Sequence, residues 1–181
     1  DDATLNQTNV FRIGAQSESA TVGQLDGIWT EIVSYEGRLL LDSTTLFNRA
    51  KVESYLALKW GATLDHDYYS SSVQTLYDVA TFNTEIVGIG KDYFSGLHQK
   101  QSTPTANPLS YVVYHGDFSA TAFPTTNEAN TNNLADSTYL ITGHDDASLT
   151  FNQTYILAND RMERIWKVDE TGAVGSVTLD F

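Results

Sequence analysis

The sequence predicts a mainly β fold in which one linking α-helix joins two β-sandwich parts. Short runs rich in Val, Ile, Tyr, Thr and Trp recur along the chain between turn-forming residues, as in β-sandwiches. One stretch, residues 43–60, instead has helical periodicity and contains neither Gly nor Pro. The 181 residues, of which 41% are hydrophobic, suffice for one domain or two small ones.

Two strands are predicted before the helix. Residues 10–14 form a short apolar alternation that ends at a glycine. Residues 28–35 form a stronger strand, bounded by an Asp-Gly pair before it and a Glu-Gly pair after it. Because two strands are too few to close a sheet, we expect this part to be the end of a larger sandwich.

The helix is predicted over residues 43–60 from an apolar stripe and from its two ends. Asp42 or Ser43 can cap the first turn, and Gly61 follows the last helical residue, where a glycine commonly ends a helix. The stripe, spaced at i, i+3, i+4 and i+7, consists of Val52, Tyr55, Leu56 and Lys59. We therefore expect an amphipathic helix with one packed face.

The remaining strands are predicted after a composition shift at residues 63–72, where we place a domain boundary between residues 1–64 and 65–181. They cover residues 85–89, 111–114, 139–142, 149–151, 165–168 and 176–181. Alternation near the fifth of them puts Arg164 and Trp166 on one face, so we expect Arg164 to stack on Trp166 as part of the framework. Residues 124–137, rich in Asn and Thr, predict a long surface loop.

Charge and composition exclude several classes of function. Lys and Arg total 10 against 23 for Asp and Glu, a net charge of −13, and such a chain repels phosphate backbones and anionic lipid. We therefore expect no nucleic-acid partner, and no apolar run approaches the ~20 residues of a membrane span. Cysteine is absent, which excludes disulfides, thiolate zinc sites and cysteine nucleophiles. An acidic, Cys-free chain rich in Ser, Thr and Asn is typical of extracellular modules.

Two groups of segments resemble known families. Residues 11–14, 27–35 and 51–61 resemble the closing strands and helix of a laminin-G-like, concanavalin-type jelly roll. The second group resembles an uncharacterised all-β domain that follows such a jelly roll in large bacterial surface proteins; it comprises residues 86–92, 95–102, 143–149 and 164–172. The resemblance implies a jelly-roll remnant at residues 1–64, an all-β sandwich at residues 65–181, and a place on the bacterial cell surface.

No enzyme signature is present, so we predict a protein that is not an enzyme. The Gly88-Ile89-Gly90 sequence lacks the third glycine and the long helix of a dinucleotide site. The chain has neither an HExxH zinc motif nor a Gly-x-Ser-x-Gly nucleophile elbow. All four histidines fall in predicted turns, where we expect solvated side chains: His66, His98, His115 and His144.

Acidic loops suggest calcium as a bound ion. Ca²⁺ prefers several oxygen ligands, and two short acidic sequences could supply them, Asp65-His66-Asp67 and Asp145-Asp146. The Asn- and Asp-rich residues 130–136 are a third candidate. None of these matches an EF-hand, and Asp145-Asp146 after a glycine is also the composition of an ordinary turn. Plain turn chemistry is therefore the alternative.

Aromatic side chains near the predicted domain boundary suggest a glycan or peptide ligand. Tyr68 and Tyr69 are the candidate ligand-binding residues, and Trp60, Tyr93 and Phe94 could also stack on sugar rings if they are exposed. The alternative is core packing, with one ring of an adjacent pair pointing in and the other out.

These observations predict a non-enzymatic structural or adhesive module of a large exported bacterial surface protein. Its first partners would be neighbouring domains of the same protein. One alternative is a calcium-dependent adhesin domain that binds a surface carbohydrate or peptide. Another is an extracellular filament subunit whose incomplete first sheet is completed by strands of the next copy.

Overall fold

The structure is a computed structural model that describes residues 30–34, 43–119, 121–154 and 160–181. The chain divides into two compact units, residues 1–36 and 37–181. In the first unit, residues 30–34 lie outside any strand, and Ile32 and Val33 are exposed. The strand predicted over 28–35 is therefore wrong for its described part, because a strand needs a hydrogen-bonded neighbour. The strand predicted at 10–14 lies outside the described residues.

Helix α1 (Ser43–Trp60) has the bounds predicted from the sequence, but the predicted stripe is not its packed face: the members of that stripe are half-buried, and the buried residues are Ala50, Ser54, Ala57 and Leu58. The N–H of Ala62 donates to the carbonyl of Ala57 at 3.0 Å, and Gly61 between them has φ +65°. This is the helix ending in which a left-handed residue lets the chain turn back on the last carbonyls. A Cβ at Gly61 would lie 2.0 Å from the carbonyl oxygen of Thr103, so only glycine fits there.

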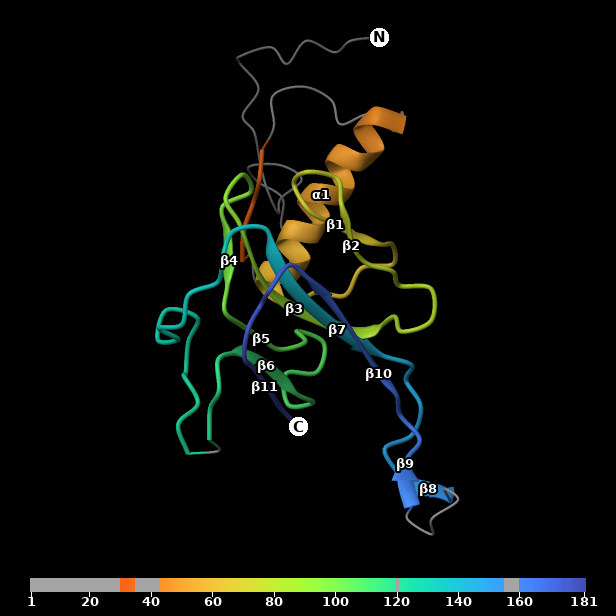
Figure 1. Cartoon of the computed structure of the whole chain (residues 1–181). Helices are drawn as coiled ribbons and strands as arrows, with labels where there is room; N and C mark the ends of the chain where they lie inside the picture. Colours follow the sequence, from red (N-terminus) through yellow and green to blue (C-terminus); the bar gives the residue numbers. More distant parts are fainter. Residues whose placement is uncertain (1–29, 35–42, 120, 155–159) are drawn as a thin grey trace, which may run out of the picture. The chain divides into compact units, whose positions relative to one another are not determined.

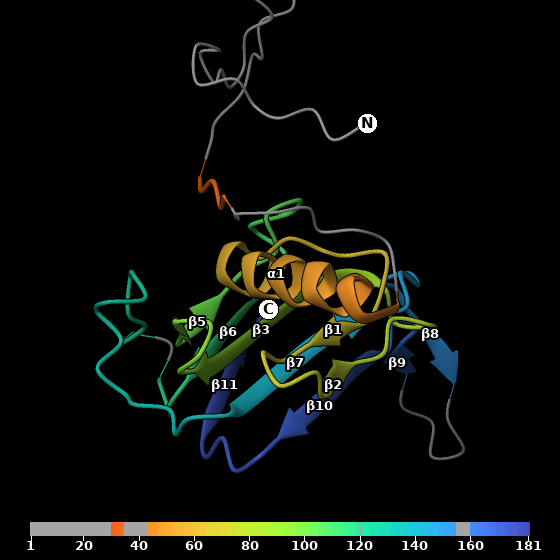
Figure 2. The same ribbon diagram turned by 90° about the horizontal axis from the view of Figure 1, so that it is seen from above.

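The second unit is built on two antiparallel sheets, and Figures 1 and 2 show α1 lying across the larger one. The larger sheet has the order β10-β7-β3-β4, formed by Trp166–Thr171, Thr138–His144, Thr84–Asp92 and Leu97–Gln99. The smaller has the order β11-β6-β5, formed by Val177–Asp180, Val112–His115 and Gln101–Ser102. Two hairpins complete the unit, β1 (Tyr68–Tyr69) with β2 (Thr75–Tyr77) and β8 (Phe151–Thr154) with β9 (Asp160–Met162).

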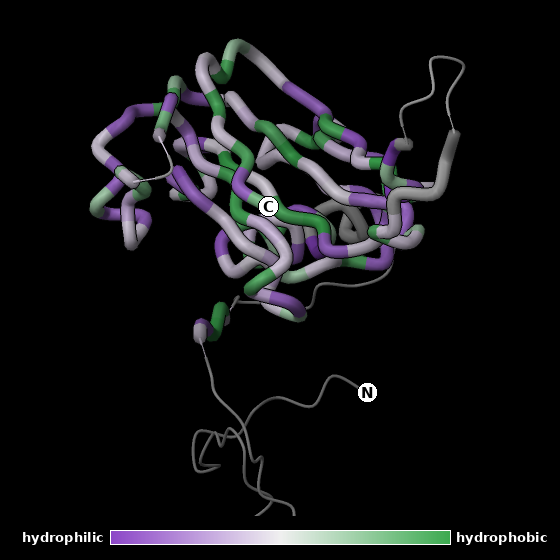
Figure 3. Tube along the Cα trace, turned by 90° about the horizontal axis from the view of Figure 1, so that it is seen from below, coloured by the Kyte–Doolittle hydropathy of each residue, from purple (hydrophilic) through white to green (hydrophobic). Residues whose placement is uncertain are grey.

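Apolar side chains pack on both faces of the larger sheet. Because side chains alternate along a strand, Ile86 of β3 faces the helix and Val87 faces the smaller sheet. One cluster joins α1 and the β1–β2 hairpin to β3 and β7; it includes Leu58, Tyr68, Tyr77, Ile86, Tyr139 and Ile141. The other joins the two sheets and includes Val87, Ile89, Tyr111, Val113, Leu140 and Val174. Figure 3 shows the hydrophobic stretches of these strands beside hydrophilic ones.

Helix α1 packs directly onto the middle of the larger sheet. A Cβ at Gly88 of β3 would lie 2.8 Å from Cδ2 of Leu58 and 2.8 Å from Cγ1 of Ile141. The missing side chain is what lets the helix approach the strand so closely. The predicted boundary at residue 64 assigns this helix to the first domain, whereas in the structure it belongs to the compact unit of residues 37–181.

The mainly β class predicted from the sequence is confirmed, with α1 as the one helix of the described residues. The predicted strands at 85–89, 111–114, 139–142, 165–168 and 176–181 correspond to β3, β6, β7, β10 and β11. The strands that were not predicted, β1, β2, β4, β5 and β9, have two or three residues each. In the part of the chain that is described, no helix is long and apolar enough to cross a membrane.

Leu58→Ala should lower the free energy of unfolding of the whole second unit by about 2–5 kcal/mol, because it leaves a cavity between α1 and β3. Leu109→Ala is the matched control, since Leu109 is 95% exposed and its loss should change stability by less than about 0.5 kcal/mol. Denaturant unfolding followed by circular dichroism measures both. Equal stability of the two variants would show that α1 is not part of this folding unit.

Candidate functional site

The two aspartates of the Asp65-His66-Asp67 sequence have different surroundings. Asp65 is exposed, whereas Asp67 uses Oδ1 to accept the N–H of Val79 at 3.1 Å. His66 between them is not a free loop histidine, because its Nε2 lies 2.9 Å from Oε2 of Glu53 on α1. The loop is thus fastened to the helix, and Asp67 acts as a turn residue.

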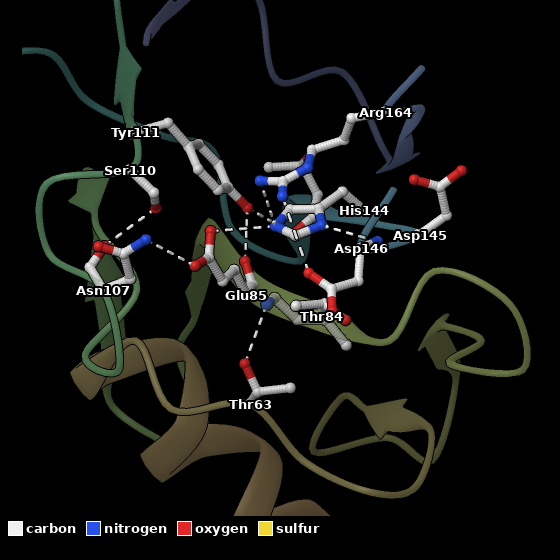
Figure 4. A network of polar contacts seen from close by, with 12 residues as sticks. Thr63, Thr84, Glu85, Asn107, Ser110, Tyr111, His144, Asp145, Asp146 and Arg164 are labelled. Carbon is white, nitrogen blue, oxygen red and sulfur yellow. Dashed lines mark hydrogen bonds and ion pairs between the residues drawn. The ribbon is translucent and has the colours of Figure 1, made fainter. Parts of the chain in front are cut away.

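Asp145 and Asp146 also have partners within the fold. Oδ1 of Asp145 accepts the N–H groups of Ala147 and Ile165, both at 3.1 Å, and the Ile165 bond is the main cause that lowers the pKa of this carboxyl group. Asp146 is exposed, 3.7 Å from the guanidinium of Arg164. Figure 4 shows the two carboxylates pointing in different directions. Among the described residues, no three His, Asp or Glu side chains gather where they could hold a metal ion.

Of the two candidate ligand-binding tyrosines, Tyr68 is closed to a ligand. Its ring is fully buried in the core and packs edge-on against Tyr77, with ring centroids 6.2 Å apart. Its hydroxyl donates to the carbonyl of Ala62 and accepts the N–H of Leu64, both at 3.0 Å. The ligand role predicted for Tyr68 is corrected here, because its position on β1 points the ring at the sheet. Tyr69 is half-buried.

His144, expected to be a solvated loop residue, is instead 1% exposed at the end of β7. Its Nε2 lies 3.0 Å from Oε2 of Glu85 on β3, and its Nδ1 accepts the N–H of Asp146 at 3.0 Å (Figure 4). The second bond fixes the tautomer, because Nδ1 must be unprotonated to accept the hydrogen bond from the N–H of Asp146, so the ring proton is on Nε2, which donates to Glu85. Sequence spacing gave no sign of this pair, since 59 positions separate the two residues.

Glu85 is held by groups from several segments. Burial by itself raises the pKa of its carboxyl group, but hydrogen bonds from His144, Asn107 and Ser110 outweigh burial and lower it. Nδ2 of Asn107 donates to Oε1 at 2.9 Å, and the Glu85 carbonyl accepts the hydroxyl of Tyr111 at 2.6 Å. The backbone of Glu85 has φ +50°, a conformation that non-glycine residues seldom adopt. These partners hold it there.

Arg164 closes the network on the side of β10. Its Nε donates to the carbonyl of Ala147 at 2.8 Å, and its guanidinium carbon lies 5.8 Å from the ring centroid of Trp166. The predicted Arg–Trp pair is therefore confirmed. Trp166 in turn packs edge-on against His144 at 5.8 Å. The cluster joins the ends of β3 and β7 through polar bonds and reaches β10 through the packing of the Trp166 ring.

The chemistry available to this network is limited by how completely it is bonded. A general base needs a ring nitrogen within reach of the proton it takes, and both nitrogens of His144 already have partners. In the described structure no hydroxyl nucleophile bonds to the ring, and neither of the two hollows described below is lined by this pair. The arrangement fits a structural role better than acid–base chemistry.

A second buried polar group, Asp92, ends β3 at the opposite end of the strand. Oδ1 accepts the hydroxyl of Ser71 and the N–H groups of Phe94 and Ser95, and Oδ2 accepts the N–H of Ser71 and the hydroxyl of Tyr139 at 2.7 Å. Burial alone raises the pKa of Asp92, but the bonds from Tyr139 and Ser71 bring it below its usual value.

The turn that Asp92 holds displays two aromatic rings. Tyr93 and Phe94 are 78% and 87% exposed and lie edge-to-face, with centroids 5.9 Å apart. The N–H of Tyr93 donates to Oδ1 of Asp136 at 2.7 Å. The sequence analysis suggested these rings as sugar-stacking candidates, and they are the most exposed aromatic pair of the described residues.

A cleft lies where the end of α1 meets β4, β5 and the loop of residues 124–133. Two adjoining hollows of about 230 Å³ and 340 Å³ share Lys59, Trp60, Gln99 and Asn127 as lining residues. Trp60 is 39% exposed and stands at the last position of the helix. The sequence singled out Trp60 as a stacking candidate, but its amide neighbours come from distant segments and were not predicted.

Comparison with known proteins identifies one family. A model for a domain of unknown function, DUF8202, matches residues 48–181. The chain belongs to the DUF8202 family. The match begins within α1, so the DUF8202 region includes the cleft at Trp60, the Glu85–His144 pair and Asp92. No curated protein and no solved structure matches the chain. The resemblance of residues 1–64 to a laminin-G-like jelly roll stays a prediction.

Asp92→Asn should lower the free energy of unfolding of this DUF8202 chain by about 1–3 kcal/mol at pH 7. The amide nitrogen of asparagine would face N–H and O–H groups that now donate hydrogen bonds to a carboxylate oxygen. The folded-state pKa of Asp92 is lowered, so its contribution is present above the unfolded-state pKa and is lost as pH falls through the folded value. The variant should therefore lose less stability than the wild type as the pH falls below about 4.

Denaturant titrations at a series of pH values measure this effect. Asp146→Asn is the matched control, because this carboxylate is exposed and asparagine tolerates the φ of +58° at that position. An acid profile of Asp92→Asn parallel to that of wild type would contradict the assignment.

Proposed function

We propose that this chain is a non-catalytic structural or adhesive module of a large exported bacterial surface protein. The observation that carries the proposal is the use made of two buried ionisable side chains; a third, His115, which was expected to be solvated, bonds through Nε2 to the carbonyl of Val174 and leaves Nδ1 without a partner. All the hydrogen-bonding atoms of the His144 and Asp92 side chains bond to other groups of the fold. The two residues lie at opposite ends of the neighbouring strands β3 and β7. The acidic, Cys-free composition and the resemblance to surface proteins support the extracellular location.

The two ends of the second unit are tied to one core, which suits a module that transmits force along a chain. At the N-terminal end, α1 packs on β3 through Leu58. At the C-terminal end, β11 pairs with β6, from Val177 opposite His115 to Asp180 opposite Val112. Pulling on either end therefore loads the same packed sheets, and neighbouring domains of the same protein are the partners that we propose.

His144→Gln tests the non-catalytic role. We expect wild type and variant alike to give no turnover of p-nitrophenyl glycosides, p-nitrophenyl acetate or casein, and the variant to be less stable by about 1–3 kcal/mol because Glu85 or Asp146 loses its partner. Absorbance assays and denaturant unfolding measure the two effects. Turnover by the wild type that vanishes in a still-folded His144→Gln variant would overturn the proposal.

The calcium-dependent form of this function stays a prediction, with Asp65, Asp67, Asp145 and Asp146 as its ligands. A native-state site filled at a hundredfold excess over its dissociation constant adds about 2.7 kcal/mol, which shifts a thermal melt by several degrees. Melting with millimolar Ca²⁺ and then with excess chelator measures the shift. Asp67→Asn and Asp145→Asn then assign it to one loop, and superimposable melts would remove calcium from the proposal. The strand-sharing filament also stays a prediction.

A further inference from the structure

Strand β10 forms one margin of the larger sheet. In the order β10-β7-β3-β4 it stands last, so among the described residues it has a hydrogen-bonded neighbour strand on one side only, and Figure 2 shows it at the outer margin of the sheet. A strand in this position presents a row of backbone N–H and C=O groups to any further strand that lies beside it. One of its six residues, Val168, is an apolar side chain that is 46% exposed.

The side chain of Val168 belongs to the inner face of the sheet, which packs on the smaller sheet. Val168 lies opposite Thr142 of β7, and Thr142 lies opposite Val87 of β3, so the three side chains share one face. Val87 belongs to the cluster between the two sheets, and both it and Thr142 are fully buried. The packed inner face therefore continues to β10 and loses its cover there. A further strand beside β10 would restore that cover.

The sequence of β10 is compatible with itself in one antiparallel register. For the inner faces of two copies to coincide, Val168 must lie opposite an inner-facing residue of the second copy, which is Trp166, Val168 or Glu170. Opposite Trp166, the register sets Lys167 against Lys167, and opposite Glu170 it sets Asp169 against Asp169. Opposite Val168, it sets each Lys167 against Asp169. Because like charges directly opposite each other destabilise a strand pair and unlike charges stabilise it, only the last register is favoured.

Lys167 and Asp169 can meet the second copy without leaving their present contacts. Nζ of Lys167 lies 2.7 Å from Oδ2 of Asp169, donates to the carbonyl of Asp78 at 3.1 Å and stands 4.4 Å from the ring centroid of Tyr77. Directly opposite residues have Cβ atoms about 4.5–5.5 Å apart, so the charges of the two copies would attract across the strands from these positions. The net charge of −13 on each copy opposes association, but at physiological salt its distant parts are screened beyond about 8 Å.

We propose that two copies of this chain associate through β10, antiparallel, with Val168 opposite Val168 and Lys167 opposite Asp169. The two four-stranded sheets then form one continuous sheet across the dimer. A two-fold contact of this kind closes on itself and gives dimers, not filaments. The inference goes beyond the proposed structural role, which requires no second copy. A strand of six residues buries less area than a standard interface of about 1,600 Å², so the association is weak and depends on concentration.

The test is sedimentation equilibrium of the 181-residue chain over a range of concentrations. The average mass should rise from 20.0 kDa toward twice that value. Lys167→Asp and Asp169→Lys each set like charges opposite each other, and each should weaken association by about tenfold or more. An equimolar mixture of the two variants should restore it, because an acidic strand then faces a basic one. Mixing cannot repair a folding defect of either variant, so the mixture separates the interface from monomer stability.

Val168→Cys tests the register, because the chain contains no other cysteine. In the proposed dimer the two thiols lie directly opposite each other, with Cα atoms about 4.5–5.5 Å apart, which a disulfide can span. Oxidation should therefore give a covalent dimer. Leu179→Cys is the matched control, since Leu179 is 36% exposed and lies on β11, the margin strand of the smaller sheet. It should stay monomeric under the same conditions.

Four results would overturn the inference. They are a constant mass of 20.0 kDa at all concentrations, growth beyond the dimer, a mixture of the charge variants that associates no better than either alone, and cross-linking of Leu179→Cys in place of Val168→Cys. The last result would move the interface to β11. Each of them leaves the proposed structural role intact.

Discussion

The close approach of Leu58 to Gly88 is the contact on which the second unit depends. It sets the helix against the centre of the larger sheet, and the smaller sheet packs on the other face of the same strands. β3 is buried on both faces as a result, so it can carry no ionisable side chain in its middle. Its polar side chains are confined to the two ends, with Thr84 and Glu85 at one and Lys91 and Asp92 at the other.

Asparagine side chains form hydrogen bonds with backbone groups that a neighbouring strand would otherwise satisfy. The loop of residues 124–133 forms no strand, yet Asn127, Asn130 and Asn132 bond to the strand backbones beside it. Nδ2 of Asn130 reaches the carbonyls of both Lys100 and His115 at 3.0 Å. The Asn-rich composition, read from the sequence as a surface loop, thus reflects a segment that completes the bonding of β4, β5 and β6.

Local signals explain what could be predicted. The bounds of helix α1 follow from the absence of Gly and Pro and from the glycine after it, and β3, β6 and β7 follow from apolar runs. The packed face of the helix did not follow from the spacing, because small residues such as Ala57 and Ser54 face the sheet. The strands β1 and β4 were not predicted, because a run of two or three residues is too short to show an alternating apolar pattern. They form only because a neighbouring strand pairs with them. The burial of His144 and Tyr68 was not predicted for a related reason. Each lies at the end of a strand, where the sequence resembles a turn but the ring points to the sheet.

Asn127 has two duties, since one side chain both holds the backbone where β4 meets β5 and lines the cleft. Its two bonds leave it little freedom to vary, because a different side chain would leave the carbonyl of His98 and the N–H of Lys100 without their partner at the same time. A substitution at this one position would therefore change the backbone between β4 and β5 and the wall of the cleft together, so the shape of the cleft is coupled to the pairing of the strands beside it.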